Sequence, residues 1–290
     1  MPEGDTIFRA ARTLHRALSG QIVTGFDSVL PKLTRVDFDK PLTGRTVEKV
    51  ASHGKWNVMH FSGDLILLTH MRMSGSWHIY RPGETWQIRP IHMRIVLKTE
   101  KIWAVAFHVP VAEFHTADTL RRREGFRTLG PDVLAAEFDA NAAAANLRAL
   151  ADLEVAPALL QQSTLAGIGN VFKSEVCFAC GVHPFRKVSS LRDEEIACLM
   201  STARRFLLAN VTEASGDQMV TYAGMRRTTG RSDFSASLWV YGRRGEACRN
   251  CGSAIQSYKQ GLEARTTFWC PQCQLMNPAQ ALRKSVSGRD

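Results

Sequence analysis

The apolar positions at the start of this 290-residue chain recur at the spacing of one helix face. They are Ile7, Ala11, Leu14 and Leu18, and several arginines occupy the opposite face. Apolar residues three or four apart are typical of a helix that buries one side. The pattern therefore predicts a packed helix over residues 7–18, which ends at Gly20 because glycine commonly follows a helix end.

From about residue 21 to residue 114 the apolar positions fall into short runs separated by Gly, Pro and Asp. Six runs have the length and composition of β-strands: residues 22–26, 56–61, 65–70, 77–80, 91–97 and 102–107. Strands this short and this closely spaced are typical of a β-sandwich or barrel.

The pattern becomes helical again after a charged crossover at residues 112–131. Apolar spacing predicts helices at residues 133–150, 158–165 and 170–179. A long amphipathic helix capped by Ser190 is expected to follow and to reach Leu207. A protein with a β-rich first part and a helical second part belongs to the α+β class.

The linker at residues 165–170 carries Gly167, Gly169 and Asn170 at the start of a predicted helix. Glycines at a helix N-terminus can aim backbone N–H groups at an anion, as a phosphate cradle does. A linker this short can equally be the turn of a helix hairpin. The sequence leaves both interpretations open.

The candidate chemistry lies in the first residues. Met1 precedes a small residue, so aminopeptidase trimming is expected to leave Pro2 as the N-terminus. A secondary amine attacks carbonyl or acetal carbons, and a helix N-terminus beside it lowers its pKa from the ordinary value of about 8. Glu3 can donate a proton to a leaving oxygen. The alternative is a frayed terminus, with Asp5 or Thr6 merely capping the helix.

Two loops of the β-rich region carry residues suited to a site. One places Lys55 beside Gly54 at the start of a strand, and the other places Arg72 and Met73 in a turn. Taken alone, Lys55 is expected to be a solvated surface lysine and Met73 a core residue.

Four of the seven cysteines form two pairs with two residues inside each pair, namely Cys248, Cys251, Cys270 and Cys273. This spacing favours a closed, structural zinc site over disulfides, with the intervening residues forming a hairpin. Zinc would stabilise the fold of such a small lobe by of order 10 kcal/mol. Cys177 and Cys180 share one face of a predicted helix and are interpreted as buried structural cysteines.

The formal net charge of +10 predicts that this protein binds a polyanionic partner. Residues 224–284 carry ten Lys and Arg against three Asp and Glu, so the zinc lobe is expected to contact nucleic acid, with Arg265 at the hairpin tip. No apolar run is long enough to span a membrane, and no signal peptide is visible, which favours the cytoplasm.

Taken together, the motifs resemble the bacterial formamidopyrimidine-DNA glycosylase and endonuclease VIII family over essentially the whole chain. The resemblance rests on five motifs: Pro2-Glu3-Gly4, Gly54-Lys55, Leu129-Gly130-Pro131-Asp132, the linker at residues 165–170, and the four cysteines with Arg265 before Phe268-Trp269. The resemblance implies four divisions: a helix and β-sandwich catalytic domain at 1–115, a crossover at 116–132, a helical domain with a helix–two-turns–helix element at 133–224, and a β-hairpin zinc finger with a tail at 225–290.

The same resemblance implies a bifunctional glycosylase and abasic-site lyase that acts as a monomer on double-stranded DNA containing oxidised bases or abasic sites. Glu3 would protonate the deoxyribose ring oxygen while the Pro2 amine attacks the anomeric carbon and the flipped base leaves. The resulting iminium would allow β- and then δ-elimination, with Lys55 acting near the phosphates. Asn170 and Arg265 would bind phosphates. Arg72 and Met73 would fill the gap left by the flipped nucleotide, which reverses the simpler interpretations of Lys55 and Met73.

Two departures from the family pattern affect the site. Asp5 and Thr6 replace the second Pro-Glu of many members, so a second acidic residue near the site is expected to be missing. Endonuclease VIII has an arginine at the position of Thr128, and here Arg127 lies one place earlier and is the candidate for that DNA contact.

The lesion preference is expected to follow the endonuclease VIII branch. Purine-type members carry an Arg-Arg-Phe-Gly loop and a longer lid over the oxidised purine, and neither is visible at residues 103–110 or 225–230. Oxidised pyrimidines are therefore the expected substrates. Met73 matches the purine-type enzymes, which keeps a formamidopyrimidine or 8-oxoguanine glycosylase as the alternative. A non-catalytic zinc-finger binder of damaged DNA would explain the charge and the cysteines but not Pro2, Glu3 and Lys55.

Overall fold

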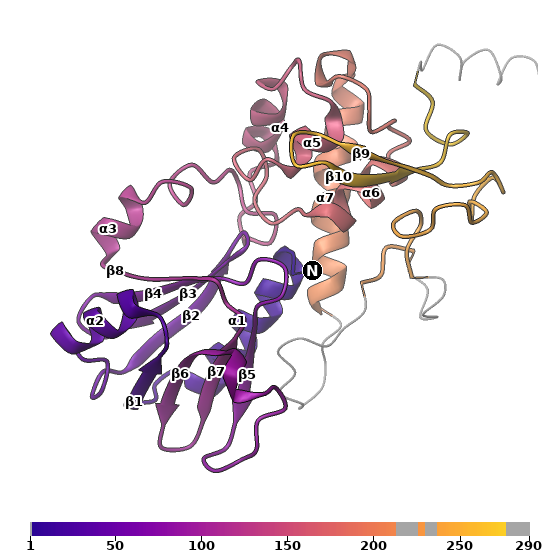
Figure 1. Ribbon diagram of the computed structural model, residues 1–290. Coiled ribbons are helices and arrows are strands. Elements are labelled where there is room, and N and C mark those ends of the chain that lie inside the picture. Colours follow the sequence, from indigo (N-terminus) through magenta and orange to yellow (C-terminus); the bar gives the residue numbers. More distant parts are fainter. Residues whose placement is uncertain (1, 213–225, 230–236, 277–290) are drawn as a thin grey trace, which may run out of the picture. The chain divides into compact units, whose positions relative to one another are not determined.

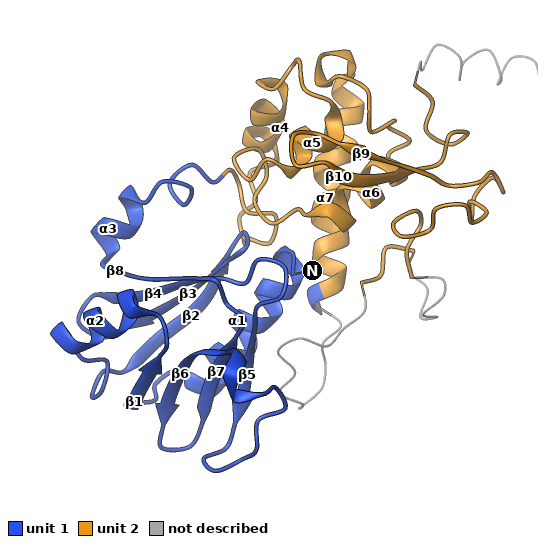
Figure 2. Ribbon diagram, in the orientation of Figure 1, with its two compact units in different colours: residues 1–129, 211–224 blue, residues 130–210, 225–290 orange. Residues whose placement is uncertain are grey.

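The computed structural model describes residues 2–212, 226–229 and 237–276. The chain forms two compact units, one of residues 1–129 with 211–224 and the other of residues 130–210 with 225–290 (Figure 2). The four-part domain division stays a prediction.

The first unit is built from two four-stranded antiparallel sheets (Figure 1). One sheet has the order β1-β6-β7-β5, and its strands are β1 (Val23–Ser28), β5 (Ser76–Tyr80), β6 (Met93–Thr99) and β7 (Trp103–Phe107). The other has the order β2-β3-β4-β8, and its strands are β2 (Val47–His53), β3 (Trp56–Phe61), β4 (Leu65–His70) and β8 (Val111–His115).

One apolar core joins the two sheets, which confirms the predicted β-sandwich. It takes Ile95 and Ala106 from one sheet and Met59 and Leu67 from the other, all at most 1% exposed. The helices α1 (Gly4–Leu18) and α2 (Pro31–Asp39) pack their apolar faces against the same core. Because α1 buries Ile7, Ala10, Ala11, Leu14 and Leu18, the predicted first helix is confirmed.

Four elements of this unit were missed by the sequence pattern: the helix α2, the strands β2 and β8, and a short helix in the crossover after β8. Both missed strands are edges of their sheet, and β8 fully buries only Ala112. An edge strand that buries few residues lacks the apolar run by which a strand is recognised. The predicted strand at residues 91–97 begins later, at Met93, because residues Pro90–His92 form a 3₁₀ turn (η1).

The crossover after β8 is not extended chain. Thr116 forms a capping box with Thr119 and starts a short helix, α3 (Ala117–Arg122). Leu120 and Phe126 pack on the face of the second sheet that points away from the core, with Val58, Ile66 and Leu68. The segment from α3 to Phe126 is therefore attached to the second sheet.

The second unit contains four α-helices and one hairpin among the residues that the structure describes. The helices are α4 (Ala140–Arg148), α5 (Val155–Leu160), α6 (Asn170–Ala179) and α7 (Asp193–Thr212), and the hairpin consists of β9 (Gln256–Gln260) and β10 (Arg265–Trp269). The predicted helix at residues 170–179 is confirmed residue by residue. Helix α6 is the centre of this unit, since all its residues from Asn170 to Phe178 are buried.

Two helix predictions in this unit were wrong in extent. The alanine-rich segment at 133–150 is helical only in α4, because Asp139 accepts a hydrogen bond from the N–H of Ala142 and caps the helix there. The segment at 158–165 is turn after Leu160. The side chain of Gln162 stabilises this turn, since its Nε2 donates hydrogen bonds to the carbonyls of Leu160 and Ile168 at 3.0 Å each.

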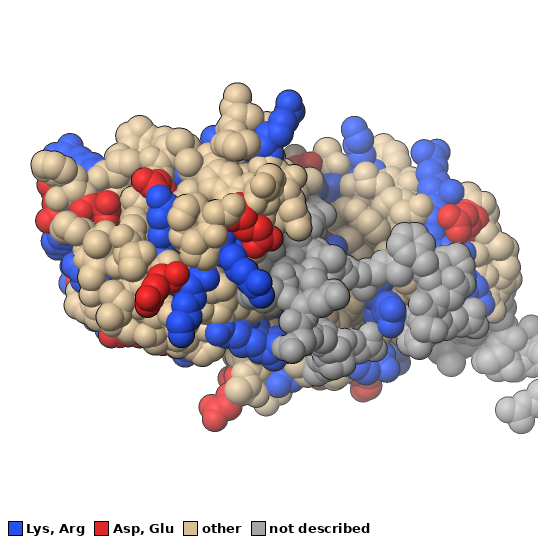
Figure 3. Space-filling model, turned by 90° about the horizontal axis from the view of Figure 1, so that it is seen from below, with Lys and Arg blue, Asp and Glu red and all other residues tan. Residues whose placement is uncertain are grey.

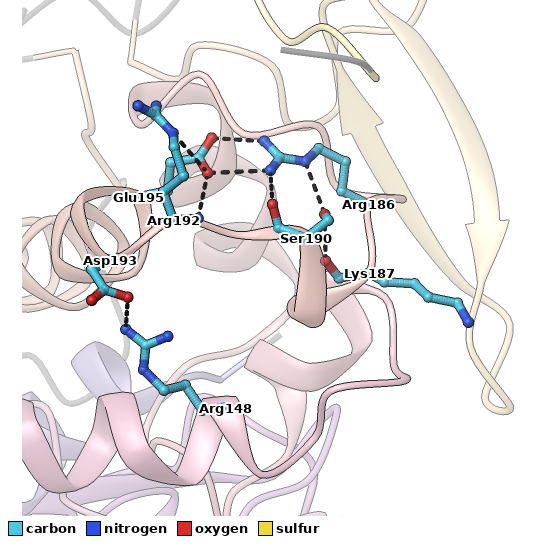
Figure 4. A network of polar contacts seen from close by, with 7 residues as sticks. All are labelled: Arg148, Arg186, Lys187, Ser190, Arg192, Asp193 and Glu195. Atoms are coloured by element: carbon cyan, nitrogen blue, oxygen red, sulfur yellow. Dashed lines mark hydrogen bonds and ion pairs between the residues drawn. The ribbon is translucent and has the colours of Figure 1, made fainter. Parts of the chain in front are cut away.

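Ser190 does not cap α7, and a buried ion pair organises the start of that helix instead (Figure 4). Ser190 ends a short 3₁₀ turn, η2 (Val188–Ser190), and contacts the guanidinium of Arg186. Arg186 binds Glu195 through NH1 at 2.7 Å, and the Glu195 carboxylate also accepts the N–H of Arg192 at 2.8 Å. The carboxylate of Glu195, in the first turn of α7, therefore caps the helix in place of the Ser190 hydroxyl.

The cysteine prediction needs one correction. Cys180 at the end of α6 is disulfide-bonded to Cys198 of α7. The short spacing in the sequence pairs Cys180 with Cys177, whereas its disulfide partner lies 18 residues away on the next helix, where spacing gave no signal. Cys177 is fully buried as expected, and burial raises the pKa of its thiol to about 12.

Candidate active site

The N-terminal residues are held inside the first unit. Pro2 is buried and Glu3 is 0% exposed, so a frayed terminus is excluded. Glu3 is the N-cap of α1, with its carbonyl accepting the N–H of Ile7 at 3.0 Å. The amine-bearing end therefore lies at the positive end of a packed helix, as the chemistry of an activated amine requires. The removal of Met1 lies outside the described residues.

Asp5 corrects one expectation. Helix α1 begins at Gly4, so Asp5 and Thr6 lie within its first turn and neither is the cap. Asp5 is 0% exposed and accepts a hydrogen bond from the Thr6 hydroxyl, and Arg9 lies 3.9 Å from its carboxylate. Asp5 is therefore a buried carboxylate in the first turn of α1, and the expected lack of a second acidic residue near Glu3 stays a prediction.

Lys55 occupies a two-residue turn between β2 and β3. Gly54 has a φ of 57°, a conformation that favours glycine, and His53 pairs directly with Trp56 across the turn. Lys55 is half-buried, which differs from the solvated lysine expected from the residue alone. The tight turn fixes its backbone at the end of two core strands.

The Arg72–Met73 turn is built around neutral His70. The N–H of Arg72, which has a φ of 51°, donates to Nδ1 of His70 at 3.0 Å. Burial and the positive charges of Arg72, Lys55 and Arg123 lower the pKa of His70 to about 4. Met73 is 56% exposed, so the interpretation as a core residue is wrong. Two of the candidate cations thus gather around one imidazole.

The second unit brings Asn170 and the hairpin together. Asn170 is the first residue of α6, and its Nδ2 donates to the carbonyl of Thr266 at 3.1 Å. The preceding residue of β10 is Arg265, whose guanidinium pairs with Glu263 at 2.8 Å. Arg265 opens β10 beside the hairpin turn, as expected. The phosphate-cradle interpretation of residues 165–170 stays a prediction, and the N–H of Gly167 is bound to Gln162.

Four sulfurs form a site that fits a metal ion. The Sγ atoms of Cys248, Cys251, Cys270 and Cys273 all lie within 4.8 Å of one another. Two of the pairs, 248–273 and 251–270, are 3.9 and 3.4 Å apart. A tetrahedral zinc with sulfur ligands at about 2.3 Å requires an edge of about 3.8 Å, so the donor set fits that geometry. The predicted hairpin between the two cysteine pairs is confirmed.

The model of the formamidopyrimidine-DNA glycosylase N-terminal domain matches residues 1–110, and that of the H2TH domain of the same enzymes matches residues 129–221. A relative in Streptomyces coelicolor, described as a probable endonuclease 8 2, is 40% identical and covers 94% of both chains. The chain belongs to the formamidopyrimidine-DNA glycosylase and endonuclease VIII family.

Other family members support this placement. The DNA-(apurinic or apyrimidinic site) lyase Nei2 of Mycolicibacterium smegmatis is 36% identical over 94% of this chain and 99% of its own. The solved structure of Lactococcus lactis Fpg in complex with DNA containing an abasic site has a TM-score of 0.79 at 25% identity, and covers 94% of this chain and 100% of that chain.

Sequence reasoning missed a residue that organises the second unit of this family member. Glu175 is fully buried on α6 and accepts the N–H groups of Trp239, Val240 and Tyr241 at 2.8–2.9 Å, together with the hydroxyl of Thr228. The signal available was a glutamate in an otherwise apolar helix. Its partners, 53 to 66 residues away, could not be found from spacing.

The remaining candidate residue, Arg127, lies on the surface. Arg127 is exposed in a turn, with its N–H bound to the carbonyl of Arg123 at 2.9 Å. On the face drawn in Figure 3, Lys and Arg side chains are interspersed with Asp and Glu. Among the described residues no helix has the length and apolar character to cross a membrane.

Proposed function

We propose that this protein is a bifunctional DNA glycosylase and abasic-site lyase of the endonuclease VIII type, acting as a monomer on chromosomal DNA in the bacterial cytoplasm. The observation that carries the proposal is the burial of Pro2 and Glu3 at the mouth of α1 in a chain of this family. A non-catalytic binder of damaged DNA has no use for a buried secondary amine beside a buried carboxyl group.

In this proposal the Pro2 nitrogen attacks C1′ of the damaged nucleotide while Glu3 gives a proton to the ring oxygen. The bond from C1′ to the base breaks and the base leaves with the proton of the Pro2 amine. The C1′–O4′ bond then breaks, O4′ keeps the proton from Glu3, and the Pro2 nitrogen and C1′ form an iminium. The cation acidifies the adjacent C–H, so the 3′ and then the 5′ phosphate can be eliminated. Lys55 acts on the departing phosphate, and Asn170, Arg127 and Arg265 bind the backbone.

Zinc is the metal proposed for the four cysteines. The sulfur distances and the all-thiolate donor set support it, since zinc in such sites is four-coordinate and closed. The metal would fold the segment that carries β9 and β10 and so hold Arg265 in place. No step of the reaction passes through it.

The substrates proposed are oxidised pyrimidines. Two relatives described as endonuclease 8 2 are 37% and 40% identical, whereas a formamidopyrimidine-DNA glycosylase of Heliobacterium modesticaldum is 30% identical and an endonuclease 8 of Salmonella schwarzengrund is 29% identical. The support for oxidised pyrimidines therefore comes from the endonuclease 8 2 relatives. The alternative, a purine-type enzyme, is supported by the exposed Met73 in the turn after His70.

Borohydride trapping on an abasic-site duplex tests the proposed chemistry. A reduced protein–DNA adduct is expected, and peptide mapping should place the linkage at the terminal Pro2. A form that retains Met1 should not be trapped. An adduct at Lys55, or equal trapping with Met1 in place, would show that Pro2 is not the nucleophile. No adduct at all, with binding intact, would favour the non-catalytic binder.

A further inference from the structure

The second sheet of the sandwich carries a polar cluster on the face that points away from the core. Its centre is Arg123, just after α3, whose Nε and NH2 donate to the two carboxylate oxygens of Glu113 at 2.5 and 3.0 Å. The same guanidinium lies over the ring of Trp56, with Cζ 4.3 Å from the ring centroid. His115 shares the Glu113 carboxylate at 3.0 Å. One planar group therefore joins the crossover to both β8 and β3.

The chain after Arg123 turns back onto the same sheet. The N–H groups of Phe126 and Arg127 both donate to the carbonyl of Arg123, at 3.1 and 2.9 Å. This turn places the ring of Phe126 5.1 Å from the ring of His53. The crossover thus contacts β2 through Phe126 and β3 through Arg123.

His53 and Trp56 are the two residues that enclose the Gly54-Lys55 turn. Phe126 therefore contacts the residue before this turn and Arg123 the residue after it. His70 also packs edge-on against Trp56, with ring centroids 4.7 Å apart. The turn that carries Lys55 is held on both sides by a segment more than 60 residues away, since Lys55 and Arg123 are 68 positions apart.

The simpler explanation is an incidental surface ion pair, which contributes little to stability. The neighbouring arginines show what such pairs look like here. Arg121 and Arg122 are 76% and 79% exposed, and within the described part of the chain their ion pairs are with Asp118 of their own helix. Arg123 is 18% exposed, forms a two-pronged contact, and stacks on an aromatic ring. Its hydrogen bonds lower the pKa of Glu113 to about 2, which keeps the pair charged at neutral pH.

We propose that Arg123, assisted by Phe126, is a positioning residue for Lys55. It does not act on the substrate itself. A lysine has a long flexible side chain, and a small displacement of its backbone is enough to misplace its ammonium group from a reacting phosphate. Clamping both residues that enclose the turn restricts that displacement. The proposal rests on the proposed lyase function, in which Lys55 acts on the departing phosphate.

A double-mutant cycle tests this relation. Single-turnover strand cleavage of an abasic-site duplex would be measured for wild type, Arg123→Ala, Lys55→Ala and the double variant, with borohydride trapping in parallel. Arg123→Ala is expected to slow cleavage by at least about tenfold in the presence of Lys55 and by less than about twofold in its absence. Arg123→Lys should not restore the rate, because an ammonium cannot form the planar two-pronged contact.

Arg122→Ala is the matched control, because it removes the same charge one residue away and should leave cleavage within about twofold of wild type. Phe126→Leu removes the ring contact with His53 and keeps an apolar side chain against the sheet. Its cycle with Lys55→Ala should show the same non-additivity if Arg123→Ala does not fold. Equal rate losses with and without Lys55, or full activity of Arg123→Lys, would overturn the positioning role. Failure of the wild-type protein to be trapped would instead count against the proposed lyase chemistry.

Discussion

His70 shows how one buried side chain can set the shape of a candidate substrate-facing turn. Its Nδ1 accepts the N–H of Arg72, so the ring must be neutral at that nitrogen. Burial is the main cause that lowers the pKa of His70 to about 4, and the positive charges of Arg72, Lys55 and Arg123 lower it further. Protonation would replace the acceptor with a donor facing another donor. The Arg72–Met73 turn is therefore expected to be stable only while His70 is neutral.

This predicts a specific loss of stability in mild acid. In the unfolded chain His70 titrates near its ordinary pKa of about 6.5, whereas in the fold it stays neutral down to about pH 4. As the pH falls between these values the unfolded state binds a proton that the folded state does not, so stability falls by up to about 3 kcal/mol. His70→Asn should reduce the stability lost between pH 7 and 4.5 by about 2 kcal/mol in urea unfolding. An unchanged pH dependence would contradict the assignment.

Arg265 offers a second test at the scale of one residue. Arg265 is the first residue of β10. Its side chain is 39% exposed, and its guanidinium forms an ion pair with Glu263. Arg265→Ala should retain one zinc per chain yet weaken binding to abasic-site DNA by roughly tenfold and reduce the salt dependence by about one phosphate contact. Zinc content and affinity at several salt concentrations measure this. Lys259→Ala, on the paired strand, is the control for charge alone. Loss of zinc with the affinity would assign Arg265 a structural role.

At the scale of the elements, Glu175 connects α6 to the segment that leads into the hairpin. A fully buried carboxylate is costly unless donors satisfy it, and here three backbone N–H groups and one hydroxyl do so. Glu175→Gln would place an amide nitrogen against these donors. We expect a loss of about 3 kcal/mol in the free energy of unfolding.

The control for this change is Glu194→Gln, an exposed residue in the first turn of α7, which should cost less than about 0.5 kcal/mol. Hydrogen exchange would locate the effect. Amides of residues 239–241 should lose protection in the Glu175 variant, while amides of β3 and β4 should not. Protection lost equally in both places would mean that Glu175 supports the fold in general and not this connection.

The elements that the sequence predicted well are those that bury a continuous or evenly spaced apolar face. Strands β3 and β4 and helix α6 matched their predicted limits because nearly every position carries the signal. The edge strand β8 and the helix α2, which buries only Leu33, carry too little of it. Helix limits failed where a single side chain decides them, as Asp139 does for α4.

The site divides in the same way. Pro2, Glu3 and the four cysteines could be proposed from the sequence, because their chemistry depends on residue type and short spacing. Lys55 was proposed only through the resemblance to the family. The side chains that hold these residues could not be proposed from the sequence. Arg123 and Glu113 are 10 positions apart on different elements, and Glu175 and Tyr241 are 66 apart. Only the folded strands and helices bring such pairs together.

At the scale of the whole molecule, the choice of lesion remains the functional question with the clearest test. Flipping a base costs a few kcal/mol, and contacts to the flipped base must offset that cost. A purine loses more stacking than a pyrimidine, so a purine enzyme needs more contacts. In this chain the position of the purine-type loop is taken by the turn at His108, which has a φ of 52° and whose ring stacks on His92 at 4.2 Å. The expected shorter lid includes residues outside those described.

The protein is therefore expected to excise oxidised pyrimidines faster than oxidised purines. Single-turnover rates on duplexes with thymine glycol or dihydrouracil should exceed the rate on 8-oxoguanine paired with cytosine by at least about tenfold, a difference of about 1.4 kcal/mol in transition-state binding. An abasic-site duplex is the control, because it removes base recognition and leaves the elimination steps. If the abasic-site duplex is cleaved normally but 8-oxoguanine is released faster than the oxidised pyrimidines, the protein belongs with the purine-type enzymes, which Met73 matches.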